Sequence, residues 1–232
     1  MTDMGILWVA TASIALVHTV TGPDHYLPFI VLAKAKKWSF PKTVFMTLVC
    51  GLGHVGSSII LGFLGVMLGW SLSKIQFLES LRGGVAGWMY IVFGLIYMIW
   101  GIHRAYLNRP HKHFDTYTEG EVFVYEHQHG ASVVQPKKFK VTPWVLFLVF
   151  VLGPCEPLIP LLTYPAAKNS FFEVVVVVTI FTIITLISMV GMVAAGYFGF
   201  SFLKTERLER YVHAIAGATL FLSGISIVFL GL

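Results

Sequence analysis

Charged residues and cysteines are both scarce in this sequence. Only 12% of its 232 residues are charged, whereas a soluble domain carries about 25%. The two cysteines, Cys50 and Cys155, are too few for a disulfide scaffold, and their spacing is not that of a zinc site. These shortages exclude an ordinary soluble domain and a disulfide-rich secreted domain.

Long apolar runs take the place of the missing charge. Hydrophobic residues make up 56% of the chain, and the mean hydropathy is +0.79. An uncharged apolar run of about 18 residues or more is long enough to cross a membrane as a helix. We therefore predict an all-α polytopic membrane protein, whose first span is not a cleavable signal peptide because no basic segment precedes it. Six spans are expected, at residues 5–33, 43–71, 84–102, 142–165, 172–200 and 211–231.

The basic residues are distributed unevenly between the loops. If the loops alternate between the two sides of the membrane, thirteen Lys and Arg residues lie on one side, in residues 34–42, 103–141 and 201–210. The opposite side has three, Lys74, Arg82 and Lys168. Cytoplasmic loops carry the excess of basic residues, so we predict a multi-pass protein of the cytoplasmic (inner) membrane with both termini outside the cytoplasm. The net charge of +5 then reflects topology, and we expect the lipid bilayer rather than nucleic acid as a partner.

The chain also contains an internal repeat. When the sequence is shifted by 131 residues, Gly22-Pro23-Asp24-His25 aligns with Gly153-Pro154-Cys155-Glu156. With a shift of 130 residues, Ala86-Gly87 aligns with Ala216-Gly217 and Gly94 with Gly224. Each half would hold three spans, an odd number, so the halves would be inverted relative to each other, as in secondary transporters. The predicted organisation is a first three-helix repeat at residues 1–102, a loop at 103–141 and a second, inverted repeat at 142–232.

Two acidic residues, Asp24 and Glu156, fall well inside apolar segments, at neighbouring positions of the repeat. A charged residue at the centre of a membrane helix costs about 2.5–3.5 kcal/mol and is therefore usually paired and functional. Proline removes a helical N–H and frees carbonyl groups, and such backbone is tolerated in a membrane only where it is buried in protein or lines a polar cavity. We expect both helices to be broken, and a site lined by Gly22, Pro23, Gly153, Pro154 and Pro157.

Histidine is concentrated around the first of these breaks. His18 and His25 are seven residues apart, which places them near one face of a helix, and His54 lies in the second span. Imidazole and carboxylate together are good ligands for Ni²⁺, Co²⁺, Zn²⁺ and Mn²⁺, and a cysteine can add a thiolate. No combination of nucleophile, base and orienting group is recognisable, so we expect neither an enzyme nor a resident cofactor. The predicted metal-contacting residues are His18, Asp24, His25, His54, Cys155 and Glu156.

These motifs resemble those of the nickel/cobalt transporter family. An intramembrane His followed by Asp-His, here His18, Asp24 and His25, is similar to the family signature, and GLGHVGSS around His54 resembles the family's histidine-bearing helix. The Gly-Pro form of the first motif resembles the urease-associated, UreH-like branch of the LysE-type transporter superfamily. The resemblance implies transport of Ni²⁺ or Co²⁺, with these four residues as counterparts of the metal-contacting residues. The spacer between His18 and Asp24 is, however, one residue longer than in the family signature.

The predicted loop at residues 103–141 is rich in histidine. It holds five of the nine histidines, and its HKH and HQH segments are potential weak metal sites. The segment EGEVFVYEHQ alternates apolar and polar residues, which predicts a short β-hairpin. We expect accessory metal binding at His111, His113, His127 and His129.

The sequence leaves several functions open, among them a scaffold or assembly factor, which would leave Asp24 and Glu156 without a role. A membrane transporter of divalent transition-metal cations, importing or exporting Ni²⁺ or Co²⁺, is the main hypothesis. A small-anion exporter of the sulfite type would need Lys or Arg inside the membrane, and none is expected deep in a span. A thiol–disulfide electron carrier would need cysteines at both breaks, whereas Asp24 stands opposite Cys155, although GPCEPLIPLL resembles the Pro-Cys elements of such carriers. Glycine-rich faces at residues 83–94 and 217–224 indicate packing within one chain or in a homo-oligomer.

Overall fold

The computed structural model describes residues 3–107, 111–116, 122–127, 141–155, 157–168, 170–199 and 206–230. The first half contains the helices α1 (Asp3–Thr21), α2 (Leu27–Lys36), α3 (Phe40–Met67) and α4 (Leu72–Leu107), with a 3₁₀ turn η1 (Pro23–His25) between α1 and α2. The second half contains α5 (Val141–Leu152), α6 (Leu158–Ala167), α7 (Phe171–Gly199) and α8 (Glu206–Ile225), which continues as the π-helical segment η3 (Ser226–Leu230). Two strands, β1 (His111–Thr116) and β2 (Val122–His127), form an antiparallel hairpin between the halves.

Within the residues that the structure describes, five helical segments are individually long and apolar enough to cross a membrane. The segments α5 and α6, with 12 and 10 residues, are each shorter than the roughly 20 residues that a bilayer requires. Large apolar side chains such as Phe45, Ile60 and Trp88 are exposed on the long helices, as expected of surfaces that contact lipid. The predicted class, a helical polytopic membrane protein, is therefore observed. The five segments are Met4–Thr21, Phe40–Met67, Leu72–Leu107, Phe171–Gly199 and Tyr211–Leu230.

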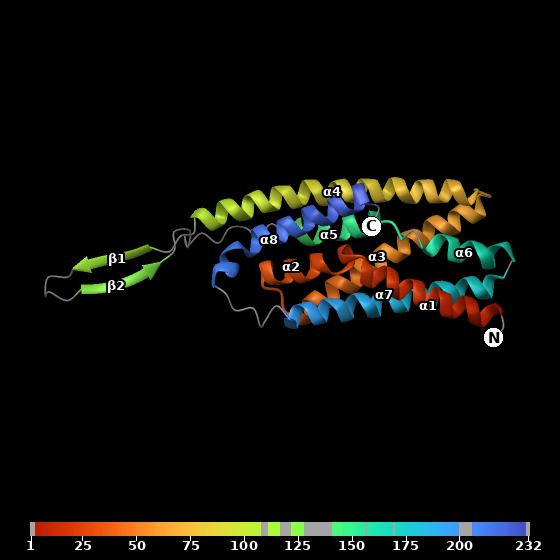
Figure 1. Cartoon of the computed structure of the whole chain (residues 1–232), viewed down its shortest axis with the longest axis horizontal. Coiled ribbons are helices and arrows are strands. Elements are labelled where there is room, and N and C mark those ends of the chain that lie inside the picture. The colour runs from red at the N-terminus through yellow and green to blue at the C-terminus, as the bar shows by residue number, and fades with distance from the viewer. Residues whose placement is uncertain are drawn as a thin grey trace.

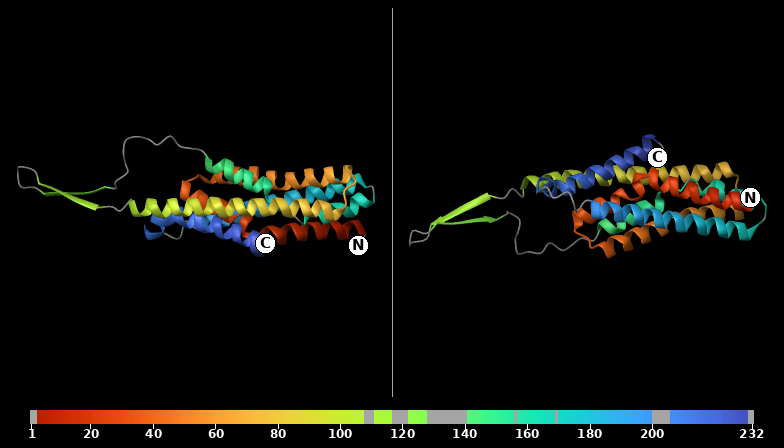
Figure 2. Two further views of the ribbon diagram at one scale, coloured as in Figure 1. Left: turned by 90° about the horizontal axis from the view of Figure 1, so that it is seen from above. Right: turned by 60° about the horizontal axis from the view of Figure 1, so that its bottom comes forward.

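The helices run along the long axis of the molecule and lie side by side (Figures 1 and 2). At the end next to the hairpin, α2 and α4 end and α3 and α8 begin. The beginning of α1, the α3–α4 connection and the turn from α6 to α7 lie at the opposite end. The basic residues in the last turns of α2 and α4, Lys34, Lys36 and Arg104, therefore share one end of the bundle.

The first interruption lies at Gly22-Pro23. Helix α1 ends at Thr21 because Pro23 has no N–H to donate to a carbonyl of the preceding turn. The Gly22 N–H donates to the carbonyl oxygen of His18 over 3.0 Å, and the His25 N–H donates to that of Gly22 over 3.1 Å. Helix α2 then begins after one short turn. We call residues 22–26 the first break.

The second interruption lies at Gly153-Pro154. Helix α5 ends just before it, and we call residues 153–155 the second break. The Gly153 N–H donates to the carbonyl oxygen of Val149 over 2.8 Å, and the carbonyl oxygen of Cys155 accepts from the N–H of Leu158 over 3.0 Å. Pro157 stands directly before the first residue of α6. Both interruptions lie at the Gly-Pro pairs from which the sequence predicts them.

Helices α4 and α8 pack at backbone distance through glycines. A Cβ added at Gly94 would lie 2.9 Å from the carbonyl oxygen of Gly217, and one added at Gly217 would lie 2.8 Å from that of Gly94. A Cβ at Gly224 would lie 2.7 Å from the carbonyl oxygen of Gly87. Small residues allow membrane helices to approach this closely. The two glycine-rich faces therefore contact each other within one chain.

Two clusters of buried side chains fill the interior of the bundle. One cluster joins α2, α3, α5 and α7 and includes Phe29, Cys50 and Phe150. The other surrounds Cys155 and includes Val55 of α3 and Phe181 of α7. Each cluster combines side chains from both halves of the chain, so the two breaks contribute to one interior.

The hairpin differs in extent from the prediction. Strand β2 falls inside the segment EGEVFVYEHQ, but its partner β1 precedes that segment. The ten residues of this segment are too few for two six-residue strands and a turn. The partner strand β1 is therefore formed by residues that begin with the earlier HKH segment. The backbone of His111 is paired with that of His127, and His113 is paired with Tyr125. His129 lies outside the described residues, and accessory metal binding by these histidines stays a prediction.

Candidate functional site at the two helix breaks

Three histidine rings from three elements form a row in the interior. The ring centroids of His18 and His25 are 4.8 Å apart with the planes at 81°, and those of His25 and His54 are 5.1 Å apart at 88°. His18 comes from the last turn of α1, His25 from η1 and His54 from α3. The turn in the chain at the first break brings the first two rings together, and the packing of α3 supplies the third.

His25 closes the first break. Its Nδ1 lies 3.1 Å from the carbonyl oxygen of Gly22 and 3.2 Å from Oδ1 of Asp24. A Cβ added at Gly22 would lie 2.5 Å from this nitrogen, so only glycine leaves room for the ring. The freed backbone of the first break is thus satisfied by a side chain of the break itself.

His54 reaches from α3 to the end of α5. Its Nδ1 lies 3.3 Å from the carbonyl oxygen of Phe150. The backbone of Gly153 passes so closely that a Cβ there would lie 3.2 Å from the same nitrogen. The Phe150 carbonyl also accepts from the Gly153 N–H over 3.2 Å, and an imidazole N–H can donate to its second lone pair. His54 therefore contacts both the histidine row and the second break.

Cys155 is the residue of the second break that meets the histidine row. Its side chain is fully buried, and its Sγ and a ring nitrogen of each of His18 and His54 all lie within 4.8 Å of one another. The Nε2 atoms of His18, His25 and His54 are buried and have no hydrogen-bond partner among the described residues. Two imidazoles and a thiolate are a donor set that can hold a transition metal. The same imidazoles can instead accept the proton of the thiol.

The other predicted metal-contacting residues are placed differently. Asp24 pairs with His25, and its side chain is 23% exposed. Neither residue belongs to the group formed by His18, His54 and Cys155. Glu156 lies outside the described residues. The structure therefore gathers three of the six predicted residues and uses two others to close the first break.

Sequence reasoning missed two charged residues beside the second break. Arg82 and Glu79 lie inside α4, which begins well before the expected start of this span at residue 84. The Nη1 of Arg82 lies 2.9 Å from Oε2 of Glu79, and its Nη2 donates to the carbonyl oxygens of Val151 and Gly153 over 2.9 and 3.2 Å. The sequence analysis counts Arg82 among the residues of a loop, and the structure corrects this, because a hydropathy window ends at a charged pair even where the helix continues. Glu79 and Arg82 are three residues apart and directly precede an apolar run. This spacing could have indicated an ion pair on one face of a continuing helix.

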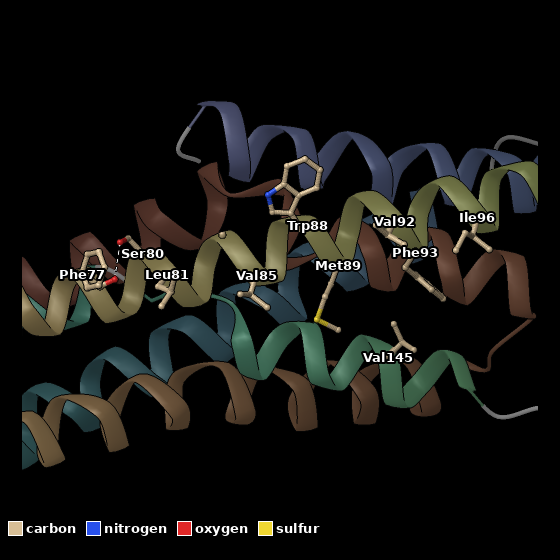
Figure 3. Close-up of a pocket in the computed structure, with 11 residues that line it drawn as sticks. Phe77, Ser80, Leu81, Val85, Trp88, Met89, Val92, Phe93, Ile96 and Val145 are labelled. Carbon is tan, nitrogen blue, oxygen red and sulfur yellow. Dashed lines mark hydrogen bonds between the residues drawn. The ribbon is translucent and has the colours of Figure 1, made fainter.

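A groove on the outer face of α4 is separate from this site. It has a volume of about 880 Å³, and its lining includes Val85, Met89 and Phe93 of α4 and Val145 of α5 (Figure 3). None of its lining residues is charged, and none is a histidine or a cysteine. Such a lining fits contact with lipid tails and offers no group for chemistry.

Residues 27–226 match the family model described as the cytochrome C biogenesis protein transmembrane region, which covers most of the chain. The chain belongs to this family. Comparison with curated proteins and with solved structures found no match. Membership of a transmembrane family, together with the long apolar helices, makes the chain an integral multi-pass membrane protein.

The family corrects the resemblance inferred from the sequence. The nickel/cobalt transporter family is the wrong family, and nickel or cobalt transport and metal binding conflict with the family that matches. The resemblance rested on short motifs, and His18, Asp24 and His25 lie before the matched region. Cys50 and Cys155 both lie inside it. Of the functions that the sequence leaves open, the thiol–disulfide electron carrier is the one that the family supports.

Proposed function

We propose that the chain carries reducing equivalents across the membrane by thiol–disulfide exchange at Cys155. The observation that carries the proposal is the proximity of its Sγ to ring nitrogens of His18 and His54, within 4.8 Å. A thiolate attacks a disulfide, whereas a thiol does not, and a neighbouring base that takes the proton activates the nucleophile. The Nε2 atoms of both rings are buried without a hydrogen-bond partner in the described part of the chain, so each can accept that proton.

Cys50 is the second thiol in this proposal and takes the role of a cysteine in the first break, where Asp24 stands. It lies in α3, one helical turn before His54, and both cysteines are buried free thiols. The two thiols belong to different clusters of buried side chains, so the proposal includes a movement that brings their Sγ atoms together. The Cys155 thiolate attacks a disulfide R–S–S–R′ on one side of the membrane, bonds to the R sulfur and releases R′S⁻. The Cys50 thiolate then displaces RS⁻ and leaves a Cys50–Cys155 disulfide. Each thiol proton passes to an imidazole and on to a released thiolate.

A thiol reductant on the other side completes the cycle. Its first thiolate opens the Cys50–Cys155 disulfide as a mixed disulfide, and a second reductant thiol releases the oxidised reductant and restores both cysteines. Two electrons then cross the membrane for each disulfide that is reduced. The electron pair travels in bonds between sulfur atoms, so the carrier needs no bound cofactor.

We further propose that the six spans form two inverted three-helix repeats, at residues 1–102 and 142–232, joined by the loop at 103–141. The helix packing that supports this is reciprocal. Helix α1 packs against α7 and α5 against α3, while α2 packs against α8 and α6 against α4. Gly94 meets Gly217, and Gly87 meets Gly224. Exchange of the two halves converts each contact into its counterpart, which is the property of a two-fold related pair.

The charge distribution supports one orientation for this arrangement. The loops at 34–42, 103–141 and 201–210, whose side has thirteen basic residues, lie in the cytoplasm. The opposite side has Lys74, at the beginning of α4, and Lys168, because Arg82 lies inside α4. Both termini then lie outside the cytoplasm, and the hairpin lies inside it.

Transfer of reducing equivalents can be measured in vesicles that contain the purified chain. Glutathione is enclosed inside, an impermeant chromogenic disulfide is added outside, and the coloured thiolate released outside is followed. We expect release with the wild type and loss of release with Cys155→Ser. Cys50→Ser should trap a mixed disulfide at Cys155 and stop sustained release. Thr179→Ser, at an exposed position of α7, is the matched control and should release thiolate like the wild type.

Equal release from the wild type, from Cys155→Ser and from empty vesicles would exclude thiol–disulfide carriage. Release that requires Cys155 and persists in Cys50→Ser would remove Cys50 from the mechanism. A trapped mixed disulfide can be identified by its mass on the peptide that contains Cys155.

A further inference from the structure

The second break is held by a residue of another helix. The Nη2 of Arg82 in α4 donates to the Oγ of Ser57 over 2.7 Å, to the carbonyl oxygen of Val151 over 2.9 Å and to that of Gly153 over 3.2 Å. The C-terminus of a helix leaves carbonyl groups unpaired and attracts positive charge. One guanidinium therefore joins α3 and α4 to the end of α5.

The charge of Arg82 is balanced by its own helix. Its Nη1 lies 2.9 Å from Oε2 of Glu79, and the two side chains are 20% and 1% exposed. Charges in a membrane are costly unless they are paired. A charged pair at this position therefore indicates a structural or functional role. The planar guanidinium can donate hydrogen bonds to the carboxylate and to the carbonyl oxygens at the same time. The ammonium group of a lysine cannot do so in the same geometry.

The residue next to Arg82 supports the proline of the same break. A Cβ added at Gly83 would lie 2.7 Å from Cγ of Pro154 and 3.2 Å from its Cδ. The proline ring thus rests directly on the backbone of α4. Cys155 follows Pro154 and is fully buried. The position of Cys155 therefore depends on how α4 holds the break.

A cavity of about 350 Å³ borders Glu79, the acidic partner of Arg82. Its lining includes Gln76, Glu79 and Ser80 of α4 and Ile159 of α6. Glu79 thus borders the cavity, while its partner Arg82 contacts the second break. The beginning of α4 lies at the end of the bundle that holds the N-terminus (Figure 1).

We propose that Arg82 is a positioning residue that keeps the second break closed over Cys155. Thiol or disulfide substrates enter through the cavity beside Glu79 when Arg82 releases the carbonyl groups of Val151 and Gly153. This inference rests on the proposed function in taking Cys155 as the exchanging thiol.

The test measures access to Cys155 rather than electron transfer. Vesicles that contain the full chain are treated with an impermeant maleimide from the side where α4 begins, and labelling of Cys155 and Cys50 is quantified separately by peptide mass spectrometry. Arg82→Gln removes charge-assisted hydrogen bonds, so labelling of Cys155 should become faster by about tenfold or more, with Cys50 unchanged. Arg82→Lys keeps the positive charge but lacks the several N–H donors of the guanidinium. It should give a labelling rate between those of the wild type and Arg82→Gln.

Cys50 is the internal control, because a general loosening of the bundle would raise labelling of both cysteines alike. That result would overturn the proposal, and so would an unchanged rate at Cys155. Ser57→Ala removes one acceptor and leaves the charged pair intact, so it serves if Arg82→Gln does not fold. A smaller rise confined to Cys155 is expected for it, and no rise would count against the proposal. If labelling is selective but the vesicles transfer no electrons, the proposed function fails and the role of Arg82 stands.

Discussion

The interior histidines use the two nitrogens of their rings for different purposes. Nδ1 of His25 lies against the carbonyl of Gly22, and Nδ1 of His54 lies against that of Phe150. The Nε2 atoms are buried and without a hydrogen-bond partner within the described ranges. A buried polar atom without a hydrogen bond costs about 1–3 kcal/mol, a cost that a purely structural histidine avoids. The bonded nitrogens fix the rings, and the unbonded ones remain for chemistry.

Replacement of His54 by glutamine separates these two uses. The amide of His54→Gln can still donate to the Phe150 carbonyl, but it cannot accept the proton of Cys155. We expect the exchange rate of Cys155 with a chromogenic disulfide to fall by about 10²–10⁴, the range for loss of a general base. His213→Gln is the control, because His213 bonds to the hydroxyl of Tyr97 at 2.8 Å and is remote in sequence from both breaks. An unchanged rate in His54→Gln would exclude the imidazole as the base.

At the scale of the helices, contact between α4 and α8 depends on the absence of side chains at particular positions. Gly94 and Gly217 bring the two backbones together, and Gly87 and Gly224 do so again further along. In the lipid bilayer the hydrophobic effect does not drive helices together. Close packing of this kind stabilises the pair through dispersion contacts and short-range backbone interactions. The pair α4–α8 thus ties the last helix of one half to the last helix of the other.

Two glycines of the same helix provide a matched test of this packing. A Cβ at Gly94 would clash with the backbone of Phe221, whereas one at Gly84 would have no heavy atom within 4 Å. Gly94→Ala should therefore lower the free energy of unfolding by about 1–3 kcal/mol through overpacking. Gly84→Ala should leave it unchanged or raise it, since alanine favours the helix. Thermal unfolding in detergent compares the two variants, and equal stability would contradict the backbone contact.

At the scale of the whole molecule, the end of the bundle beside the hairpin holds the basic last turns of α2 and α4, with Lys34, Lys36 and Arg104. The proposed orientation places this end in the cytoplasm. Alkaline phosphatase, which folds outside the cytoplasm, should be active when fused to either terminus, and a fluorescent protein that folds only inside should be dark at both positions. A fluorescent fusion at either terminus would reverse the assignment. A fusion within the loop at residues 128–140 should give the opposite pattern and serves as the control.

The approximate limits of most spans and the positions of both breaks could be predicted from the sequence, because hydropathy and Gly-Pro pairs act locally. The meeting of Cys155 with His18 and His54 was predictable only in outline, since it depends on how α5 packs against α3. Arg82 was not recognised, because its role arises from carbonyl groups in the other half of the chain. The short histidine motifs indicated the wrong family, since the same residue types serve as metal ligands and as bases.

The two breaks are fastened differently. His25 closes the first break from within, so that break opens only if its own turn unfolds. Arg82 holds the second break from α4, through hydrogen bonds to the carbonyl oxygens of Val151 and Gly153. The two breaks of a duplicated chain are therefore not energetically equivalent. We expect the free-energy barrier to opening to be higher at the first break, where local unfolding is required, than at the second, where separation of two packed helices is enough.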